Sequence, residues 1–510
     1  MKKVIRYFLL LIGSFQLISC EDWLTVYPQN EQIRDEYWTS KEEVESVLAA
    51  GYVYFRDAVQ NLIDWGELRG ACIYNQYGSD LQIFQVTPDD GICNWASLYK
   101  VINMANSVLA NAEAVHERDK TFEEAVMKSY LTEAYFLRAL SYFYLVRNWR
   151  DAPLILDPYE TDEIGYEKEK SSENELIDQI KSDITTALAT GAAKERFEKD
   201  WATKGRATKW ALYALMADVC LWSEDYAGAI MNCNEILNAS SPFRPAFVKD
   251  PSKWYEMYYP GNSNESIFEI QWDQVNYNQS NNLPTLFGSS TPTYLYTERM
   301  LQDFIDETDI TGINNAVRTI YGSYLPNTAA ATDYKNATQG YIWKYTGIGF
   351  QEQTRPSNEQ DPNFIIYRVA DVMLMKAEAL ILRDDNEEGW QTAIDLINEV
   401  RVRSNLPKIE PVLSEIGEAD MLQYVLDERK MELAAEGKRW YDLLRFGKRN
   451  GFKYRDRFLI SEVVEYNNTA NPSWIQSVLR DDDALYLPIW SKELENNKLL
   501  IQNPYYGIVK

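Results

Sequence analysis

Few side chains in this sequence are of the types that bind metals or act as nucleophiles. The chain of 510 residues has a single histidine, His116, in the polar stretch AEAVHERDK at the expected end of a helix. One histidine excludes zinc sites built on two or three imidazoles and argues against a Ser-His-Asp triad. A surface role for His116 is the better interpretation. We therefore expect no metal site and no cofactor.

The five cysteines differ in what their positions allow. None belongs to a Cys-x-x-Cys pair or lies near the histidine, which again argues against zinc. In an exported protein Cys72 and Cys93 could form a disulfide, because they flank one loop region. Cys220 and Cys233 are expected to be small core residues on neighbouring helices. The remaining cysteine, Cys20, has a more specific context.

Cys20 follows a short export signal. The basic start MKKVIR precedes an apolar run from Tyr7 to Ile18, which is shorter than the roughly 20 residues that span a bilayer. The ending Leu-Ile-Ser-Cys resembles a bacterial lipoprotein cleavage site, where a lipid is joined to the cysteine thiol and Cys20 becomes the first residue. The alternative is an ordinary signal peptide with a chance cysteine. We predict that residues 1–19 are a lipoprotein signal peptide and that the chain is exported and held by lipid.

The charge of the chain restricts its partners. With 51 basic and 77 acidic residues, the net charge is −26 at pH 7. This field would repel a phosphate backbone, so nucleic acid is not expected, and it would repel anionic lipid, so membrane attachment should rely on acyl chains. The acidic runs 384–388 and 481–483 lack the spacing of a calcium-binding loop and are better interpreted as solvated loops.

Hydrophobic periodicity predicts a mainly α-helical chain. Ser40 and Glu43 form a capping box at the start of the first helix. Residues 61–94 are predicted to be a loop region because they are rich in glycine. Residues 241–360 lose helical periodicity and are rich in Pro, Gly, Asn, Gln, Ser and Thr, as functional insertions often are. Further helices are predicted at 95–115, 122–149, 172–190, 205–222, 365–383, 387–404, 418–436 and 438–447.

Two segments have the pattern of a repeated helix pair. In ALMADVCLWSEDYAGAIMNCNEIL, Ala217 and Ala229 lie on either side of a short turn, and small residues at such positions let antiparallel helices approach closely. VMLMKAEALILRDDNEEGWQTAIDLINEV repeats the pattern with Ala377 and Ala393 and a longer turn. This is typical of tetratricopeptide units; the alternative is two unrelated helical hairpins.

The segment LDERKMELAAEGKRWYDLLRFGK (426–448) mixes charges with apolar residues. Arg429 falls within an apolar stripe and needs acceptors, which Glu432, Glu436 or Asp442 could provide. A catalytic role for Glu428, Glu432 and Glu436 is an alternative, but a charged helix face interleaved with core residues is the commoner cause of this pattern.

Aromatic residues are abundant, with 15 Trp, 35 Tyr and 18 Phe. Many must belong to the core. A surplus of Tyr and Trp beside Asn and Gln in loops also suits sugar binding, since the C–H faces of a sugar stack on aromatic planes while its hydroxyls form hydrogen bonds.

Several strings, in this order along nearly the whole mature chain, resemble the SusD/RagB family. They are the lipidated cysteine, the Tyr27-Pro28 arm, YLTEAYFLRALSYFYLVRNW (130–149), FIIYRVADVMLMKAEAL (364–380), segment 426–448 and Leu487-Pro488-Ile489. The resemblance implies a helical superhelix of four tetratricopeptide-like helix pairs with a loop-rich insertion packed against it. It implies one domain over residues 20–510, with helical repeat parts at about 40–240 and 360–450 and a ligand-side part at about 241–360.

The resemblance also implies a location and a partner. Such proteins are outer-membrane lipoproteins of Bacteroidetes-type bacteria, and Glu21-Asp22 after Cys20 is similar to the signal that sends them to the outer face. They pair with a SusC-like TonB-dependent transporter and help to capture a glycan, or less often a peptide. The family binds its cargo and passes it on, so no catalysis is implied.

Ligand residues in this family do not form a motif that transfers residue by residue. The resemblance places ligand sites in the loops before the first repeat and in the middle insertion, here 62–95 and about 270–350. We select aromatic and amide residues there as candidates, namely Tyr74, Asn75, Tyr77, Trp272, Tyr277, Tyr294 and Trp343. For each, the alternative is an aromatic side chain that only packs or lies on the surface.

Other functions remain open at this point. A glycoside hydrolase would use two carboxylates, but 77 acidic residues always provide some pair, so their number argues nothing. A repeat scaffold that binds only protein is a further alternative. We expect a glycan-binding surface lipoprotein that serves a transporter.

Overall fold

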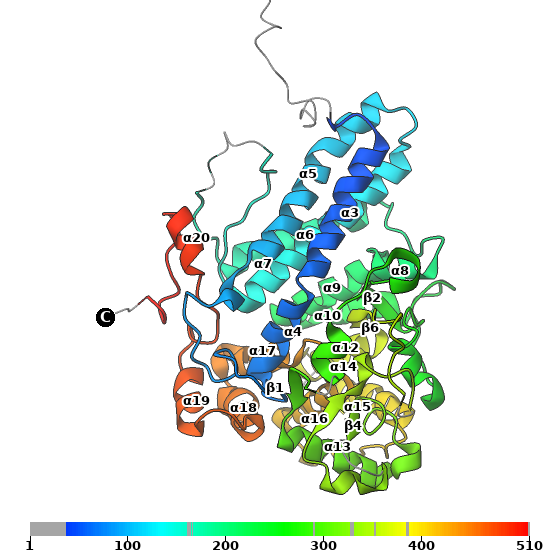
Figure 1. The fold of residues 1–510 in the computed structure, drawn as a ribbon, viewed down its shortest axis with the longest axis vertical. Coiled ribbons are helices and arrows are strands. Elements are labelled where there is room, and N and C mark those ends of the chain that lie inside the picture. The colour runs from blue at the N-terminus through cyan, green and yellow to red at the C-terminus, as the bar shows by residue number, and fades with distance from the viewer. Residues whose placement is uncertain are drawn as a thin grey trace, which may run out of the picture.

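The computed structural model describes residues 37–160, 165, 167–288, 291–326, 331–350, 353–383 and 387–507. The predicted signal peptide, Cys20 and the Tyr27-Pro28 arm lie outside these residues, as does part of the acidic run 384–388. The described chain is mainly α-helical, as predicted (Figure 1).

Long helices near the N-terminus form the first part of the fold. They are α3 (Lys41–Asp57), α5 (Ala96–Arg118), α6 (Glu124–Trp149) and α7 (Glu173–Ala189), which lie side by side in Figure 1. The capping box predicted for α3 is confirmed, because Oε2 of Glu43 accepts the backbone N–H of Ser40 at 2.9 Å. Helix α6 is buried over most of its length, since its neighbours cover it from several sides.

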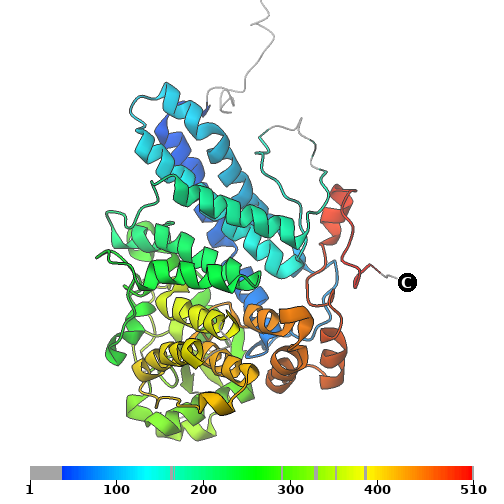
Figure 2. The ribbon, with the colours of Figure 1, turned by 180° about the vertical axis from the view of Figure 1, so that it is seen from behind.

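Antiparallel helix pairs continue the array, and Figure 2 shows them stacked one after another. The first predicted pair is α9 (Lys209–Trp222) and α10 (Tyr226–Leu237), and the second is α14 (Val369–Arg383) and α15 (Glu387–Arg403). Helix α10 packs against α14, so the two pairs are neighbours. Four alanines that the sequence singled out are completely buried in these pairs: Ala217, Ala229, Ala377 and Ala393. Their assignment as tetratricopeptide units stays a prediction.

The last helices close the array. Helix α16 (Glu418–Glu432) ends four residues earlier than the predicted limit of 436, and α17 (Arg439–Phe452) follows after Gly437, whose φ is +71°. Helices α18 (Ser461–Tyr466), α19 (Pro472–Leu479) and α20 (Ser491–Asn496) complete the C-terminal part. In Figure 1 the C-terminal helices lie to the left of the helix array.

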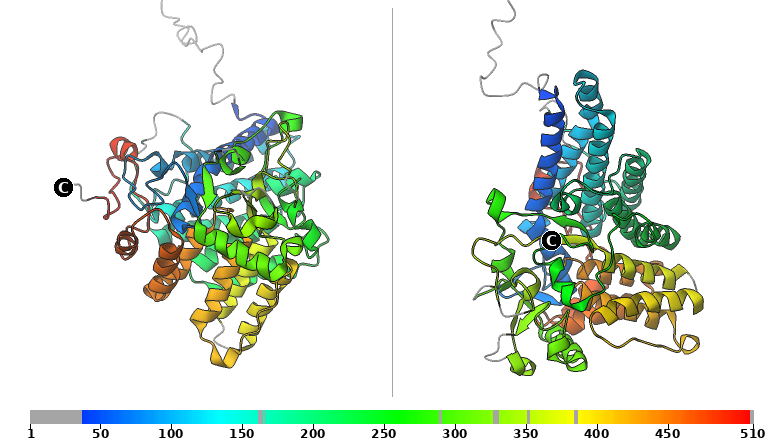
Figure 3. Two further views of the ribbon diagram at one scale, coloured as in Figure 1. Left: turned by 60° about the horizontal axis from the view of Figure 1, so that its bottom comes forward. Right: turned by 90° about the vertical axis from the view of Figure 1, so that its right-hand side faces the viewer.

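The middle of the chain packs against one side of the array, as the right view of Figure 3 shows. Its strands form antiparallel pairs: β2 (Ser266–Ile270) with β6 (Phe364–Arg368), β1 (Ile73–Asn75) with β3 (Tyr294–Tyr296), and β4 (Tyr324–Pro326) with β5 (Gly340–Ile342). The helices on this side are α8 (Asp200–Gly205), α11 (Gln274–Tyr277), α12 (Leu283–Gly288) and α13 (Glu298–Thr311).

Three secondary-structure predictions were wrong. Residues 365–368, predicted as the start of a helix, belong instead to strand β6 (Phe364–Arg368), because the fully buried run Phe-Ile-Ile-Tyr-Arg pairs with β2. Helix α13 lies inside the segment predicted to be loop-rich, although its apolar residues recur at helical spacing. The region predicted as loop at 61–94 begins with most of helix α4 (Val59–Glu67), where Gly66 allows a close contact with Gly437 instead of ending the helix.

The cysteines and the histidine considered above make neither a disulfide nor a metal site in the described part of the chain. Cys72 and Cys93 are both buried free thiols, so they do not form the disulfide that the sequence left open. His116 is partly buried and bonds the carbonyl of Phe122 just beyond α5. Within the described ranges no group of acidic, cysteine and histidine side chains could hold a metal, and no helix is both long and apolar enough to cross a membrane.

Candidate functional site

A pocket on the loop-rich side owes its shape to one pair of strands. Strands β2 and β6 pair antiparallel, with Ile270 opposite Phe364 at the end of the ladder. The residues that continue the strands therefore meet. The backbone N–H of Trp272 donates to Oδ1 of Asn363 at 3.4 Å, and Nδ2 of Asn363 donates to Oε1 of Gln271 at 3.1 Å. The strand that the sequence analysis took for helix is thus what brings these pocket residues together.

A buried carboxylate organises the amide groups of this pocket. Glu269 is fully buried, and its Oε2 accepts from Nδ2 of Asn363 at 2.7 Å and from Nε2 of Gln271 at 3.2 Å. Nε2 of Gln271 also donates to Oδ1 of Asn262 at 2.7 Å. Burial raises the pKa of Glu269, and hydrogen bonds from Ser266 and Asn363 oppose the rise. Because its position is fixed by the strand pair, Glu269 holds the amides in one orientation.

Aromatic side chains line the same pocket, which has a volume of about 500 Å³. Trp201 is 47 % exposed and Tyr277 is 60 % exposed, while Trp272 is partly buried. This volume is typical of ligand pockets, which range over roughly 300–1,000 Å³. The other lining residues are Pro260, Asn262, Gln271, Asp273, Gln279, Asp361 and Asn363. Aromatic planes beside amides and carboxylates are the groups that bind a sugar ring through its C–H faces and hydroxyls.

The two short helices that carry the exposed aromatics are tied down locally. In α8, Nζ of Lys204 donates to the carbonyl oxygen of Ser266 at 2.6 Å, and the next residue, Gly205, lies so close to Gln271 that a Cβ would be 2.5 Å from Cγ. In α11, Oδ1 of Asp273 accepts the backbone N–H of Asn276 at 2.8 Å, which caps the helix that ends at Tyr277. The pocket is therefore largely preformed.

The sequence predicted Trp272 and Tyr277 as ligand-binding candidates but not several of their neighbours in the pocket. Trp201 stands among charged residues in EKDWATKG, which is a recognisable signal of an exposed aromatic. The amides of Asn262, Gln271 and Gln279 gave no such signal, since only the strand pair and the loops beyond it bring them together. Nδ2 of Asn262 and Nε2 of Gln279 donate to no group in the described part of the chain and are available to a ligand.

A second group of candidates lies on the small sheet of β1 and β3. Tyr74 and Asn75 are partly exposed, and Tyr77 is 68 % exposed just beyond β1. Oδ1 of Asn75 accepts the backbone N–H of Tyr77 at 2.9 Å, and the Tyr77 hydroxyl donates to the carbonyl of Thr291 at 3.3 Å. Asn75 and Tyr77 form one exposed cluster, whereas Tyr74, the neighbour of Asn75 in strand β1, points to the opposite face of the strand. Figure 1 places β1 well apart from β2, so this cluster and the pocket are separate surfaces.

Two of the selected aromatics belong to the core. Tyr294 is 1 % exposed, and its hydroxyl donates to Oδ1 of Asp64 at 2.5 Å. Trp343 is fully buried in a small cluster with Trp254 and Tyr255, and its Nε1 donates to the carbonyl of Gly349 at 2.7 Å. Neither ring offers a free face to a ligand, because packing of the insertion covers both. For Tyr294 and Trp343 the alternative of a packed aromatic side chain therefore describes the structure.

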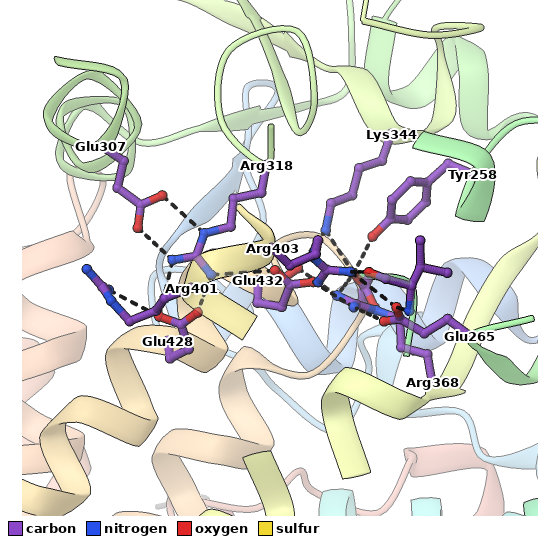
Figure 4. Close-up of polar contacts among 12 residues, drawn as sticks. Tyr258, Glu265, Glu307, Arg318, Lys344, Arg368, Arg401, Arg403, Glu428 and Glu432 are labelled. Atoms are coloured by element: carbon purple, nitrogen blue, oxygen red, sulfur yellow. Dashed lines mark hydrogen bonds and ion pairs between the residues drawn. The ribbon is translucent and has the colours of Figure 1, made fainter. Parts of the chain in front are cut away.

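A buried network of ion pairs fastens the insertion to the helices (Figure 4). Arg368, at the end of β6, bonds Glu265 at 3.1 Å, Glu432 at 2.7 Å and Glu436 at 3.0 Å. Arg318 of the insertion joins Glu307 of α13 to Glu428 of α16. Lys344 bonds Glu436 at 2.8 Å, Arg403 bonds Glu265 and Glu432, and Arg401 bonds Glu428. Each carboxylate thus faces at least one cation.

These contacts give the glutamates of segment 426–448 a structural role. Burial would raise the pKa of Glu432, but the nearby charges of Arg403, Arg368 and Arg318 outweigh it and hold the pKa well below its ordinary value. Glu428, Glu432 and Glu436 are at most 2 % exposed and all ion-paired, so none can reach a substrate in solution. Arg429 finds its predicted acceptor in Asp442, at 2.9 Å.

Two family models cover most of the chain. The model described as "SusD family" matches residues 257–506, and the model described as "Starch-binding associating with outer membrane" matches residues 22–221. Among curated proteins, the SusD-like protein P38 of Formosa agariphila is 28 % identical, with 99 % of each chain covered. A SusD-like protein of Bacteroides ovatus is 24 % identical, over 93 % of this chain and 87 % of the relative.

Solved structures share the fold. A SusD superfamily protein from Bacteroides thetaiotaomicron has a TM-score of 0.72 at 20 % identity, over 92 % of this chain and 99 % of the other. A laminarin-binding SusD-like protein has a TM-score of 0.68 at 20 % identity, over 92 % of this chain and all of the other. Because the family models, the full-length relatives and the fold agree, the chain belongs to the SusD family.

Proposed function

We propose that this protein is a lipid-anchored, outward-facing protein of the outer membrane that binds an oligosaccharide and delivers it to a SusC-like TonB-dependent transporter. The observation that carries the proposal is the preformed pocket in which Trp201, Trp272 and Tyr277 surround amide groups held by Glu269. The laminarin-binding structural neighbour and the family model described as starch-binding support a saccharide as cargo.

A screen of purified protein against a glycan array, followed by calorimetry on the best oligosaccharide, tests the binding. Trp201→Ala and Tyr277→Ala should each weaken binding about 2- to 12-fold, because one aromatic contact is worth roughly 0.5–1.5 kcal/mol. Both side chains are largely exposed, so their removal should leave the fold intact. Phe243→Ala, which removes an aromatic ring that is 44 % exposed and lines neither the pocket nor the β1–β3 cluster, is the matched control.

The same titration separates the two candidate surfaces. If Tyr77→Ala abolishes binding while Trp201→Ala and Tyr277→Ala bind as the wild type does, the cluster on β1 and β3 is the site and the pocket is not. An array without hits, together with binding of peptides, would replace the glycan by a peptide as cargo. Release of reducing sugar from a bound oligosaccharide would favour a glycoside hydrolase. If the protein bound only other proteins, the remaining interpretation would be a repeat scaffold for protein binding.

The lipid anchor is tested separately from the ligand. A Cys20→Ala protein should fold normally and leave the membrane fraction, because its thiol is the only attachment point for lipid that the sequence offers at the predicted cleavage site. Far-UV circular dichroism of the variant controls for folding. If the variant stayed in the membrane fraction of cells lacking the transporter, the lipid-anchor interpretation would be wrong.

The location and the partner have their own readouts. Added protease should cleave the protein on intact cells if it faces outward. Affinity purification from detergent-solubilised outer membranes should recover a TonB-dependent transporter of the SusC type. Recovery of no such transporter under conditions that preserve other outer-membrane complexes would contradict the delivery role.

A further inference from the structure

A second cavity of about 320 Å³ adjoins the saccharide pocket. The two cavities share the lining residues Trp201, Gln271 and Gln279, so they adjoin at these side chains. Nη1 of Arg56 donates to Oε1 of Gln279 at 3.0 Å, which fixes this boundary against helix α3. A ligand seated on Trp201 therefore has an empty space directly beside it.

The wall of this second cavity is mainly apolar. Its apolar residues come from one face of α3 and from strand β2: Leu48, Ala49, Val53, Phe55, Phe268 and Ile270. Ala49 and Val53 lie one helical turn apart on α3. Both are exposed, and Val53 is 41 % exposed. Helix α3 thus carries a wider apolar stripe than its packing in the core requires.

Two of the polar side chains at the cavity, Tyr52 and Arg206, are committed to Glu133. The hydroxyl of Tyr52 donates to Oε2 of Glu133 at 2.7 Å, and Arg206 donates to both oxygens of Glu133 at 2.9 and 2.7 Å. Ordered water in a cavity needs two to four polar partners, and these groups have few hydrogen bonds left to offer. The apolar wall formed by α3 and β2 therefore suits an apolar group better than water or a hydroxyl.

The volume indicates how large that group is. An engineered apolar cavity of about 150 Å³ binds benzene, and this cavity has about twice that volume. An acetyl group would leave most of it empty, whereas an aromatic ring with a short linker would fill it. We propose that the cavity receives an apolar substituent, of the size of an aromatic acyl or aryl group, carried by a saccharide bound in the adjoining pocket. This inference rests on the proposed saccharide binding and adds the substituent as a determinant of specificity.

Matched pairs of glycosides test the inference with the full chain. Methyl and 4-nitrophenyl β-glycosides of glucose, galactose and xylose differ only in the apolar group. For whichever sugar binds, we expect the 4-nitrophenyl form to bind at least tenfold more tightly than the methyl form in calorimetry. Ala49→Trp should fill the cavity and reduce this preference to less than twofold, while affinity for the methyl glycoside stays the same. Ala227→Trp, at an exposed alanine on α10, is the matched control and should keep the preference.

Each outcome decides one point. Equal affinities for the two forms, or a preference that Ala49→Trp leaves unchanged, would overturn the inference while leaving the saccharide pocket intact. Failure of every glycoside to bind, together with a glycan array without hits, would overturn the proposed saccharide binding and the inference with it. A preference that Ala49→Trp loses and Ala227→Trp keeps supports the inference, and a loss of methyl-glycoside affinity in Trp201→Ala supports the saccharide pocket.

Discussion

Glu432 provides the sharpest test of how the insertion is held in place. It is completely buried, and its carboxylate bonds Arg368 at 2.7 Å and also pairs with Arg403, while Arg318 lies within 3.5 Å. Glu432→Gln keeps the size of the side chain and removes only its charge. The guanidinium groups of Arg318, Arg368 and Arg403 then lose the negative charge that they share. Because the site is buried, solvent does not replace that charge.

The size of the expected loss follows from this geometry. The network combines Arg318, Lys344, Arg368, Arg401 and Arg403 with Glu265, Glu307, Glu428, Glu432 and Glu436, so the charges balance. Removing one partner of a buried ion pair costs about 3–5 kcal/mol, because the remaining charge is uncompensated. We therefore expect Glu432→Gln to lower the free energy of unfolding by about 3–5 kcal/mol at pH 7.

Urea unfolding followed by far-UV circular dichroism measures this loss through the midpoint and the slope. The pKa of Glu432 is held below its ordinary value of 4.5 by the surrounding arginines, against the effect of burial. Its charge therefore stabilises the folded state above that value, and the stabilisation is lost as the pH falls. The difference between wild type and variant should shrink in acid.

A surface ion pair is the matched control. Asp420 pairs with Arg457 at 2.7 Å, with the two side chains 54 % and 40 % exposed, and Asp420→Asn should cost no more than about 1 kcal/mol. If Glu432→Gln cost as little as Asp420→Asn, the network would not be what fastens the insertion, and the reasoning from burial and charge would be refuted.

Two further predictions concern the packing around helix α4. Burial raises the pKa of Asp64 to about 6, and the hydrogen bond from the Tyr294 hydroxyl opposes the rise. Because the folded state holds this proton more tightly than the unfolded chain, whose carboxyl has a pKa near 3.8, the contribution of Asp64 to stability falls as the pH rises through that window. The free energy of unfolding of the wild type relative to Asp64→Asn should therefore decrease between about pH 4 and pH 6; a constant or rising difference in urea titrations would contradict the assignment. Gly66→Ala would place a Cβ 2.0 Å from the carbonyl oxygen of Gly437, and we expect a loss of about 1–3 kcal/mol in thermal unfolding. Gly91→Ala, where nothing lies within 4 Å, should change stability little, and equal effects of the two alanines would argue against the close contact.

The sequence predicted most of the helices because helical periodicity depends on neighbours in the chain. Helix α3 with its capping box, the long helix α6, and the pairs α9–α10 and α14–α15 lie where apolar spacing placed them. The short strands escaped this reasoning. A short apolar run such as 364–367 looks the same in a helix and in a strand, and only its pairing with β2 decides between them.

In the candidate site, too, the local sequence predicted some residues and the tertiary packing decided the others. Aromatic and amide composition marked Trp272, Tyr277, Tyr74, Asn75 and Tyr77, all of which the structure leaves at least partly exposed. Tyr294 and Trp343 have the same side-chain chemistry, but packing of the insertion buries them. Exposure of a single aromatic depends on what covers it, which its own sequence neighbourhood does not specify.

By itself the sequence determined the helical class, the positions of the helix pairs, the acidic surface charge and the pattern of an export signal ending at Cys20. These are properties of composition and of short-range spacing. Only the tertiary structure decided that Glu428, Glu432 and Glu436 are buried ion-pair partners, and that Trp201, Gln271 and Asn363 line one pocket. Residues 110 and 92 positions apart, such as Arg318 with Glu428 and Gln271 with Asn363, meet only when the insertion folds back onto the helices.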